Sequence, residues 1–187
     1  REEVLGAEDP ATLVSLNSIG IVLSVSGNDN KAEKYFRKGL ELREKVLGAE
    51  HPDTLTSVNN MGVLHRRLGN YDESEKYTRR ALEGNEKVLG AEDLGTILSV
   101  YNMGEILNSM GNYEEAEKYS RRALEVREKV LGAGHPKTLD SLESRGSILQ
   151  SMENYEDAEK LYKRVLEGRE KVFGPEHLDT LESLNNM

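Results

Sequence analysis

A period of 42 residues restricts the fold of this 187-residue sequence more than any other feature. The triplet Val-Leu-Gly, or its variant Val-Phe-Gly, ends at Gly6, Gly48, Gly90, Gly132 and Gly174. Self-similarity at a fixed period indicates stacked structural units that each contact only their neighbours. We therefore expect a single repeat array over residues 1–187, divided into residues 1–42, 43–84, 85–126 and 127–168 and a partial fifth repeat at 169–187.

Each repeat is predicted to form two helices, called here helix A and helix B. In the second repeat, Pro52 suits the first position of helix A, where its missing N–H costs nothing, and Gly69 ends that helix. Apolar residues three and four positions apart predict one buried stripe along helix A, at Leu55, Val58, Met61, Leu64 and Leu68. Asn70 is a favourable N-cap for helix B, and Gly90 ends it. The residues that helix B is expected to bury are Tyr77, Ala81, Leu82, Val88 and Leu89.

Glycine recurs inside helix A, although it costs about 1 kcal/mol there relative to alanine. These glycines are Gly20, Gly62, Gly104 and Gly146, and a small residue recurs in helix B at Ala32, Ser74, Ala116 and Ala158. Small residues on both helices predict that helices A and B approach each other closely. Because one helix pair cannot cover its own apolar face, each pair is expected to bury that face against the next pair.

Charged residues follow helix B in two series of acid-first pairs four residues apart. The first series is Glu33–Arg37, Glu75–Arg79, Glu117–Arg121 and Glu159–Lys163, and the second is Glu41–Lys45, Glu83–Lys87, Glu125–Lys129 and Glu167–Lys171. Each such pair contributes only about 0.2–0.5 kcal/mol to a helix. We interpret the series as a solvated helix face; the alternative is a basic docking patch at Arg79–Arg80 and Arg121–Arg122.

The composition limits the classes of partner. The formal net charge is −9, and the acidic residues are spread along the chain, so the surface is expected to repel phosphate groups and nucleic acid. No apolar run approaches the roughly 20 residues of a membrane span, and no signal peptide begins the sequence. The chain has no cysteine, which excludes disulfides and thiolate zinc sites. We expect a soluble, cytoplasmic protein with neither a nucleic acid nor a membrane partner.

The repeated residues resemble the tetratricopeptide repeat. The similarity lies in Met61–Gly62, Gly69–Asn70–Tyr71, Ser74 and Ala81, with Met103–Gly104, Gly111–Asn112–Tyr113, Ala116 and Ala123 in the next repeat. The usual repeat has about 34 residues, and this one is extended by the segment that includes the Val-Leu-Gly triplet. The longer form resembles the repeats of kinesin light chains, nephrocystin-3 and the sensor arms of signalling NTPases.

This resemblance implies an all-α, right-handed solenoid of antiparallel helix pairs. It also implies a concave wall of helix A residues that binds extended peptides or short helical segments. The expected peptide-binding residues are Asn17, Asn59, Asn60, Val63, Arg66, Arg67, Tyr101, Asn102, Glu105 and Asn108. Further positions expected to face the wall are Val14, Ile21, Ser24, Thr56, Leu98, Asp140, Glu143, Ser147 and Gln150.

Two kinds of wall residue have more than one interpretation. Asn60 and Asn102 match the asparagine that hydrogen-bonds the ligand backbone in related arrays, since an amide offers a donor and an acceptor; alternatively, they are exposed polar residues or join neighbouring helices. Arg66 and Arg67 are expected to attract an acidic ligand group or to pair with Glu105. A wall that runs from apolar through basic to acidic would orient a ligand.

The sequence predicts neither an enzyme nor a metal site. His51, His135 and His177 occupy equivalent inter-helix turns, and a solenoid keeps equivalent positions apart. His65 replaces a leucine of helix A and is expected to pack against its neighbours. No spacing of serines and acids assembles a nucleophile with a base. We therefore expect no catalytic residues, no metal and no cofactor, and a non-enzymatic protein-interaction scaffold.

Self-association and a sensor role are the alternative functions. The sequence begins in the tail of a helix B and ends inside a helix A, as a piece of a longer array would. Leu181, Leu184 and Met187 would form an open apolar end that stacks head-to-tail on another molecule. Within a signalling NTPase such an array would instead be the sensor arm, and within a kinesin light chain it would carry cargo.

Overall fold

The computed structural model describes residue 6 and residues 8–185, and all regular secondary structure within them is helical. The chain divides into an N-terminal unit, residues 1–99, and a C-terminal unit, residues 100–187, with the boundary inside helix α6 (Leu94–Ser109). No helix in the described part of the chain is both long and apolar enough to cross a membrane.

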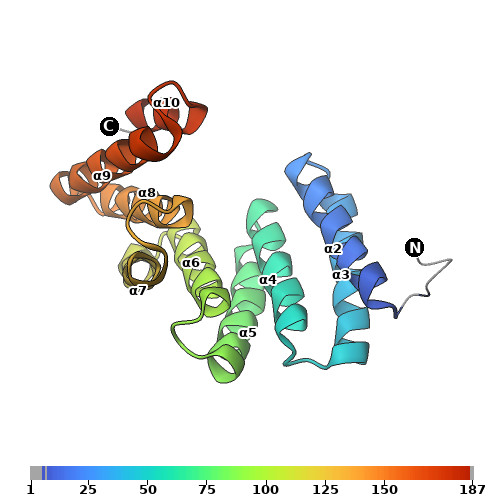
Figure 1. Cartoon of the computed structure of the whole chain (residues 1–187). Coiled ribbons are helices and arrows are strands. Elements are labelled where there is room, and N and C mark those ends of the chain that lie inside the picture. The colour runs from blue at the N-terminus through green and yellow to red at the C-terminus, as the bar shows by residue number, and fades with distance from the viewer. Residues whose placement is uncertain (1–5, 7, 186–187) are drawn as a thin grey trace. The chain divides into compact units, whose positions relative to one another are not determined.

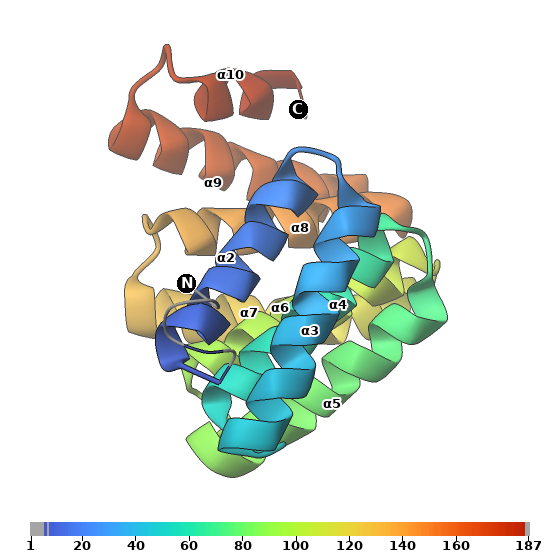
Figure 2. The same ribbon diagram turned by 90° about the vertical axis from the view of Figure 1, so that its right-hand side faces the viewer.

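The N-terminal unit consists of consecutive helix pairs. Helices α2 (Pro10–Val25) and α3 (Asp29–Leu47) form one pair, α4 (Pro52–Arg67) and α5 (Tyr71–Leu89) form the next, and α4 also packs on α3. Figures 1 and 2 show α2 and α3 side by side in both views. The first residues of α6 follow after a short turn.

The C-terminal unit continues the pattern with α7 (Tyr113–Leu131), α8 (Pro136–Ser151), α9 (Tyr155–Phe173) and α10 (Leu178–Asn185). Helix α8 packs on both α7 and α9, and α10 packs on α9. Helices α2, α4, α6, α8 and α10 are therefore the A helices, and α3, α5, α7 and α9 are the B helices. The predicted all-α architecture of repeated helix pairs is confirmed.

A side-chain cap begins each A helix. The Nδ1 atoms of three histidines accept a hydrogen bond from the backbone N–H two residues later, at 3.1 Å for His51, 3.1 Å for His135 and 3.2 Å for His177. Asp9 and Asp93 do the same with Oδ1, at 2.8 and 2.7 Å. Capping of this kind satisfies a backbone donor that the helix leaves unpaired. The sequence assigned the helix start to proline and missed the cap beside it.

The turn from helix A to helix B needs a left-handed residue. Gly27, Gly69 and Gly111 supply it with φ of 76°, 76° and 79°, whereas the fourth repeat uses Glu153 with φ of 60°. A residue with a Cβ pays roughly 1–2 kcal/mol for this conformation. The fourth repeat therefore keeps the turn geometry of the others at a local cost in stability.

The predicted close approach of helices A and B occurs where glycine faces a small residue. The Ser74 hydroxyl donates to the Gly62 carbonyl oxygen at 2.7 Å, and a Cβ added at Gly62 would lie 2.3 Å from Thr78 Oγ1 and 3.3 Å from the Ser74 carbonyl oxygen. At Gly104 the nearest atoms would be 3.4 Å away. Gly20 and Gly146 instead make room for aromatic rings, those of Phe36 and Tyr162.

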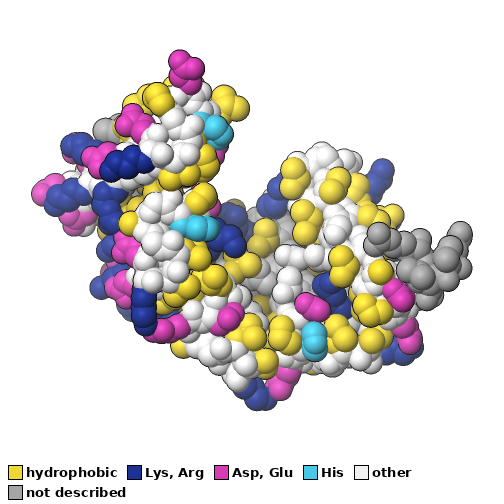
Figure 3. Space-filling view, viewed as in Figure 1, with side chains coloured by type: hydrophobic (Ala, Val, Ile, Leu, Met, Phe, Trp, Pro, Cys, Tyr) yellow, Lys and Arg dark blue, Asp and Glu magenta, His cyan; other side chains and the backbone are white. Residues whose placement is uncertain are grey.

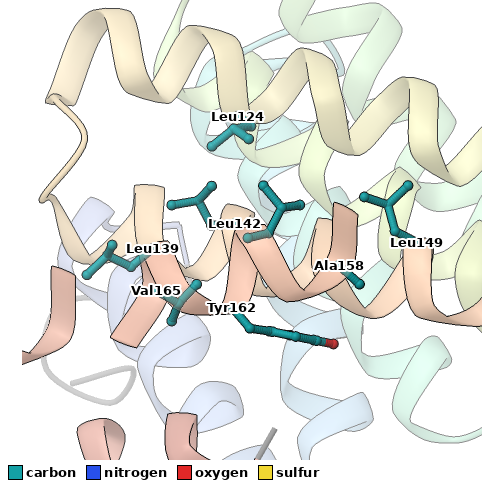
Figure 4. Close-up of a cluster of buried hydrophobic side chains, with 8 residues drawn as sticks. Leu124, Leu139, Leu142, Leu149, Ala158, Tyr162 and Val165 are labelled. Carbon is teal, nitrogen blue, oxygen red and sulfur yellow. The ribbon is translucent and has the colours of Figure 1, made fainter. Parts of the chain in front are cut away.

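The core of each unit lies between the A and B helices. In the N-terminal unit it contains Ala32, Phe36, Leu40, Val58, Met61, Leu64 and Ala81. Figure 4 shows the corresponding cluster of the C-terminal unit, with Leu139 and Leu142 of α8 beside Val165 and Tyr162 of α9. Val88 and Leu89, which were expected to be buried, are 43% and 37% exposed. The prediction was wrong because α5 has 19 residues and its partner α4 only 16, so the last turn of α5 has less to pack on.

The first series of charge pairs is confirmed, and two pairs of the second series, Glu41–Lys45 and Glu83–Lys87, are corrected. All four pairs from Glu33–Arg37 to Glu159–Lys163 are salt bridges. Lys45 and Lys87 pair instead with Glu8 and Glu50, in the turn before the A helix. The long lysine side chains reach a glutamate of the preceding repeat. The spacing of residues along one helix does not reveal such a contact. Arg80 also pairs with Glu44 of the neighbouring B helix, at 2.6 Å, which favours a solvated, paired face over a basic docking patch.

The two glycine environments make a matched test of helix packing. Gly62→Ala is expected to lower the free energy of unfolding by about 2 kcal/mol, because the new methyl group overlaps Thr78 and the backbone of α5. Gly104→Ala is expected to be neutral or to stabilise by up to about 1 kcal/mol, because alanine favours the helix and its methyl group meets the nearest atoms at ordinary van der Waals distance. Urea unfolding of both variants measures the difference; equal changes would contradict the packing argument.

Candidate functional site

One buried side chain near the end of each B helix connects it to the following A helix. The donors are Arg43, Asn85, Arg127 and Arg169, and each bonds the serine fourteen residues later, namely Ser57, Ser99, Ser141 and Ser183. Each donor also bonds a carbonyl oxygen ten residues later, at distances from 2.9 to 3.4 Å. We call these contacts the inter-repeat tethers. Sequence reasoning missed them, although a donor and a serine recur at this spacing in the sequence.

Desolvation acts on the tether arginines. Burial lowers the pKa of Arg43 and of Arg127, and the nearby Asp53 and Tyr101, respectively, oppose this. Burial is also the largest single influence on Arg169, but the hydrogen bonds with Glu143 and the charges of Glu143, Asp140 and Asp179 together outweigh it and leave the pKa of Arg169 raised. The tether arginines are therefore charged groups held in partly desolvated surroundings, next to the surface of the A helices.

A pocket of about 240 Å³ lies between α6 and α8 in the C-terminal unit, and we call it the A-helix pocket. Its lining residues are Tyr101, Glu105, Asn108, Asp140, Glu143, Ser144 and Ser147. Three of these, Tyr101, Glu105 and Asn108, are predicted peptide-binding residues. Asp140, Glu143 and Ser147 were predicted to face the same wall, so the fold brings together side chains that the sequence assigned to a common surface.

Tether arginines support the side chains of the A-helix pocket. The guanidinium carbon of Arg127 lies 4.5 Å from the centre of the Tyr101 ring, within the range of a cation–π contact. Arg169 bonds both carboxylate oxygens of Glu143, at 2.7 and 3.1 Å. Such paired contacts hold the carboxylate in one orientation. The same arginines thus join successive helices and position the pocket lining.

Carboxylates dominate the A-helix pocket. Glu105 accepts a hydrogen bond from the Ser144 hydroxyl, Glu143 is neutralised by Arg169, and the Asp140 side chain is 54% exposed and 3.9 Å from Arg169. Desolvation raises the pKa of Asp140, and the charges of Arg169 and Arg127 oppose that shift. With three carboxylates and two guanidinium groups, the pocket favours a ligand cation over an anion.

Asn102, another predicted site residue of α6, is not among the residues that line the A-helix pocket. It is only 8% exposed. The backbone-binding role expected for it stays a prediction.

The predicted site residues of the N-terminal unit are engaged in contacts between helices. Asn60 Nδ2 donates to Asn17 Oδ1 at 2.8 Å, which joins α4 to α2. Arg67 lies 3.4 Å from Asp29, the first residue of α3, and so pairs within its own unit. Of the interpretations considered for Asn60, this hydrogen bond corresponds to the one in which Asn60 joins neighbouring helices.

Burial differs among the remaining predicted residues of this unit. Asn59 is 4% exposed, although it was expected to face the wall, while Val63 and Arg66 are half-buried. Val14 and Ile21 of α2 are exposed, as the predicted apolar part of the wall requires, and Val22 and Val25 add to the same helix surface. Figure 3 shows hydrophobic side chains over the surface formed by α2.

The histidines do not form a metal centre in the described part of the chain. No group of three or more His, Cys, Asp or Glu side chains suited to a metal ion occurs among those residues. His51, His135 and His177 cap helices, as described above. His65 is buried and stacks on Tyr77 with ring centres 5.4 Å apart and planes 4° apart, which confirms its predicted packing role.

Successive pairs of A and B helices define this protein as a helical repeat protein. The family model of the tetratricopeptide repeat matches residues 19–87, 93–171 and 140–187. The chain therefore belongs to the tetratricopeptide repeat family. No match is found among curated proteins.

The fold of this chain is similar to those of solved structures that include a putative kinesin light chain. BtubC (BKLC) from P. vanneervenii is 20% identical, with a TM-score of 0.81 over 94% of this chain and 70% of that one. A putative kinesin light chain from Podosopora anserina with nearly identical repeats is also 20% identical, with a TM-score of 0.69 over 91% of this chain and 81% of that one. A substituted form of the same Podosopora anserina protein gives a TM-score of 0.72. At this level of identity the similarity establishes the fold alone.

Proposed function

We propose that this protein is a non-enzymatic interaction scaffold that binds an extended peptide or short helical segment on the surface of its A helices. The observation that carries the proposal is the A-helix pocket, in which predicted wall residues of α6 and α8 converge. Its volume of about 240 Å³ is below the range of about 300–1,000 Å³ typical of small-molecule sites. A pocket of this size suits one side chain of a longer ligand.

The chemistry of the pocket selects a cationic side chain. Asp140 offers an exposed carboxylate, and Tyr101, another lining residue, offers an aromatic ring. Asn108 and Ser147 add neutral groups able to hydrogen-bond a peptide backbone. We infer that an arginine or lysine of the ligand enters the pocket and that its flanking backbone lies along α6 and α8.

The lining of the A-helix pocket lacks the imidazole base that usually activates a serine nucleophile. Ser144 donates its hydroxyl hydrogen to Glu105, and Glu143 is held by two hydrogen bonds from Arg169. We propose no catalytic or cofactor role, and a cytoplasmic protein whose acidic surface discourages nucleic acid binding.

The Asp140 carboxylate provides the test of this proposal. An acetylated Gly-Ala-Arg-Ala-Gly amide is expected to shift amide signals of α6 and α8 in two-dimensional NMR spectra, and its citrulline analogue to bind about tenfold more weakly. Asp140→Asn is expected to weaken arginine-peptide binding by a similar factor. Because the pKa of Asp140 is raised, wild-type affinity should increase as the pH rises through that pKa, and Asp140→Asn should lose the increase.

Glu125→Gln is the matched control, since Glu125 is exposed on α7 and does not line the pocket. It removes the same charge from the same unit. Equal losses of affinity in Asp140→Asn and Glu125→Gln would show that net charge, not the pocket, attracts the peptide. Signals that shift away from α6 and α8 would also contradict the proposal.

Self-association through α10 is a second candidate function. Leu181 and Leu184 are 45% and 52% exposed, whereas Leu139 and Leu142, which hold the equivalent positions of α8, are each 1% exposed. Exposed apolar surface of this kind favours contact with another helix. Met187, predicted to belong to the same surface, lies outside the described residues. A sensor arm in a signalling NTPase, or a cargo-binding arm as in kinesin light chains, would be compatible with either surface.

Sedimentation velocity tests the self-association candidate. If α10 stacks on another molecule, the weight-average sedimentation coefficient should rise with protein concentration, and Leu184→Glu should abolish the rise because it places a charge in the contact. A coefficient that stays at the monomer value up to the highest soluble concentration would rule this candidate out. The peptide-binding proposal does not depend on the result.

A further inference from the structure

A second pocket lies on the B-helix side of the C-terminal unit, between α7 and α9 and beside the end of α8. We call it the outer pocket. Its volume is about 580 Å³, and its lining includes Arg121, Arg145, Leu149, Met152, Lys160 and Leu161. It shares no residue with the A-helix pocket, so the proposed function does not account for it.

The repeat register explains why this pocket exists. Leu161 stands where the other repeats carry Tyr35, Tyr77 and Tyr119. In the N-terminal unit, Tyr77 packs against the core and stacks on His65, and its proximity contributes to the raised pKa of Arg37, after the larger effect of the hydrogen bond from Arg37 to Glu33. The Tyr77 ring of α5 therefore lies against His65 of α4 and near Arg37 of α3.

The residues around Tyr77 have direct counterparts in the outer pocket. Steps of two repeats convert Arg37 to Arg121, His65 to Leu149 and Tyr77 to Leu161, and all three counterparts line the pocket. A leucine side chain lacks the ring and hydroxyl of tyrosine. The outer pocket thus includes the space that an aromatic ring occupies in the N-terminal unit, with the buried side chains of Leu149 and Leu161 as its apolar floor.

A change of charge accompanies the missing ring. Arg145 stands where Met61 and Met103 are fully buried. Arg145 bonds Glu117 Oε1 through Nη2 and Nε at 2.9 and 3.2 Å, and Arg121 bonds Glu117 Oε2 at 2.7 Å. Two guanidinium groups therefore share one carboxylate at the inner edge of the pocket.

The lysines at the exposed rim of the outer pocket are paired with carboxylates. Lys118 pairs with Glu115, and Lys160 pairs with both Glu156 and Asp157. The positive charge that the pocket offers a ligand is therefore that of Arg121 and Arg145, which share the one carboxylate of Glu117 beside an apolar floor.

We propose that the outer pocket is a docking site for a partner protein segment that presents an aromatic side chain next to an acidic residue. The aromatic ring takes the space left by Leu161, and the carboxylate pairs with Arg121 and Arg145. A ring that enters a preformed apolar site loses little conformational entropy, because an aromatic side chain has only two rotatable bonds. The pairing with two guanidinium groups distinguishes an acidic segment from a neutral one.

Two substitutions that restore the residues of other repeats test the docking site. Leu161→Tyr supplies the missing ring from the chain itself, and Arg145→Met removes the added cation. The probe is an acetylated Gly-Asp-Phe-Asp-Gly amide, with one analogue that has alanine for phenylalanine and another that has asparagine for both aspartates. Titrations of the full 187-residue chain are followed by two-dimensional NMR.

The wild-type chain is expected to show saturable shifts of amide signals in α7 and α9 and at the end of α8. Leu161→Tyr should lower the affinity about tenfold or more, because its ring competes with the probe for one space. Arg145→Met should remove most of the difference between the aspartate and asparagine probes. Asp140→Asn, in the other pocket, should leave binding unchanged, which separates this inference from the proposed function.

Three results would overturn the inference. They are the absence of saturable shifts up to about 10 mM probe, where binding energies fall below those of a specific contact, equal affinities of wild type and Leu161→Tyr, and shifts confined to other helices. Thermal unfolding of Leu161→Tyr at or above the wild-type temperature verifies that the variant is folded. A loss of binding together with a lower unfolding temperature would count against the inference, because filling the space should not destabilise the fold.

Discussion

The inter-repeat tethers are the constraint on which the rest of the structure depends. A buried donor that finds no partner costs about 1–3 kcal/mol, so Arg127 requires Ser141 and the Lys137 carbonyl at the positions where the structure has them. This requirement sets the position of α8 relative to the end of α7. The same guanidinium group lies against Tyr101, so packing within the unit and the shape of the A-helix pocket rest on one side chain.

The sequence predicted the fold closely because its signals are local and repeated. Proline and glycine mark the helix ends, and the predicted helix pairs and the tetratricopeptide family are confirmed. Asn70 stands at the N-cap of α5 as predicted, but its side chain makes no capping hydrogen bond. Errors arose where a residue's surroundings depend on the length or position of another helix. Leu89 is exposed because α5 is longer than its partner helix α4, and Lys87 reaches Glu50 across a repeat boundary. Neither fact can be read from the spacing along a single helix.

For the candidate sites, too, the sequence predicted which residues share a surface but not the contacts between neighbouring helices. The resemblance to the tetratricopeptide repeat assigned Tyr101, Glu105 and Asn108 to one surface, and they line one pocket. The hydrogen bond between Asn60 and Asn17 depends on how two repeats pack, so the sequence left several interpretations open. For the outer pocket, the exchange of tyrosine for leucine was present in the alignment of repeats. That this exchange leaves a pocket became apparent only from the contacts that Tyr77 makes in the N-terminal unit.

A double-mutant cycle on Arg127 and Ser141 tests the central claim, that a buried side-chain contact holds successive helices together. Urea unfolding would be measured for the wild type, Arg127→Met, Ser141→Ala and the double variant. We predict that each single variant is destabilised and that the coupling energy is at least about 1 kcal/mol, because removal of either partner leaves the other unsatisfied. Effects that add to within about 0.3 kcal/mol would contradict the account and would place the cohesion of the repeats in their apolar contacts alone.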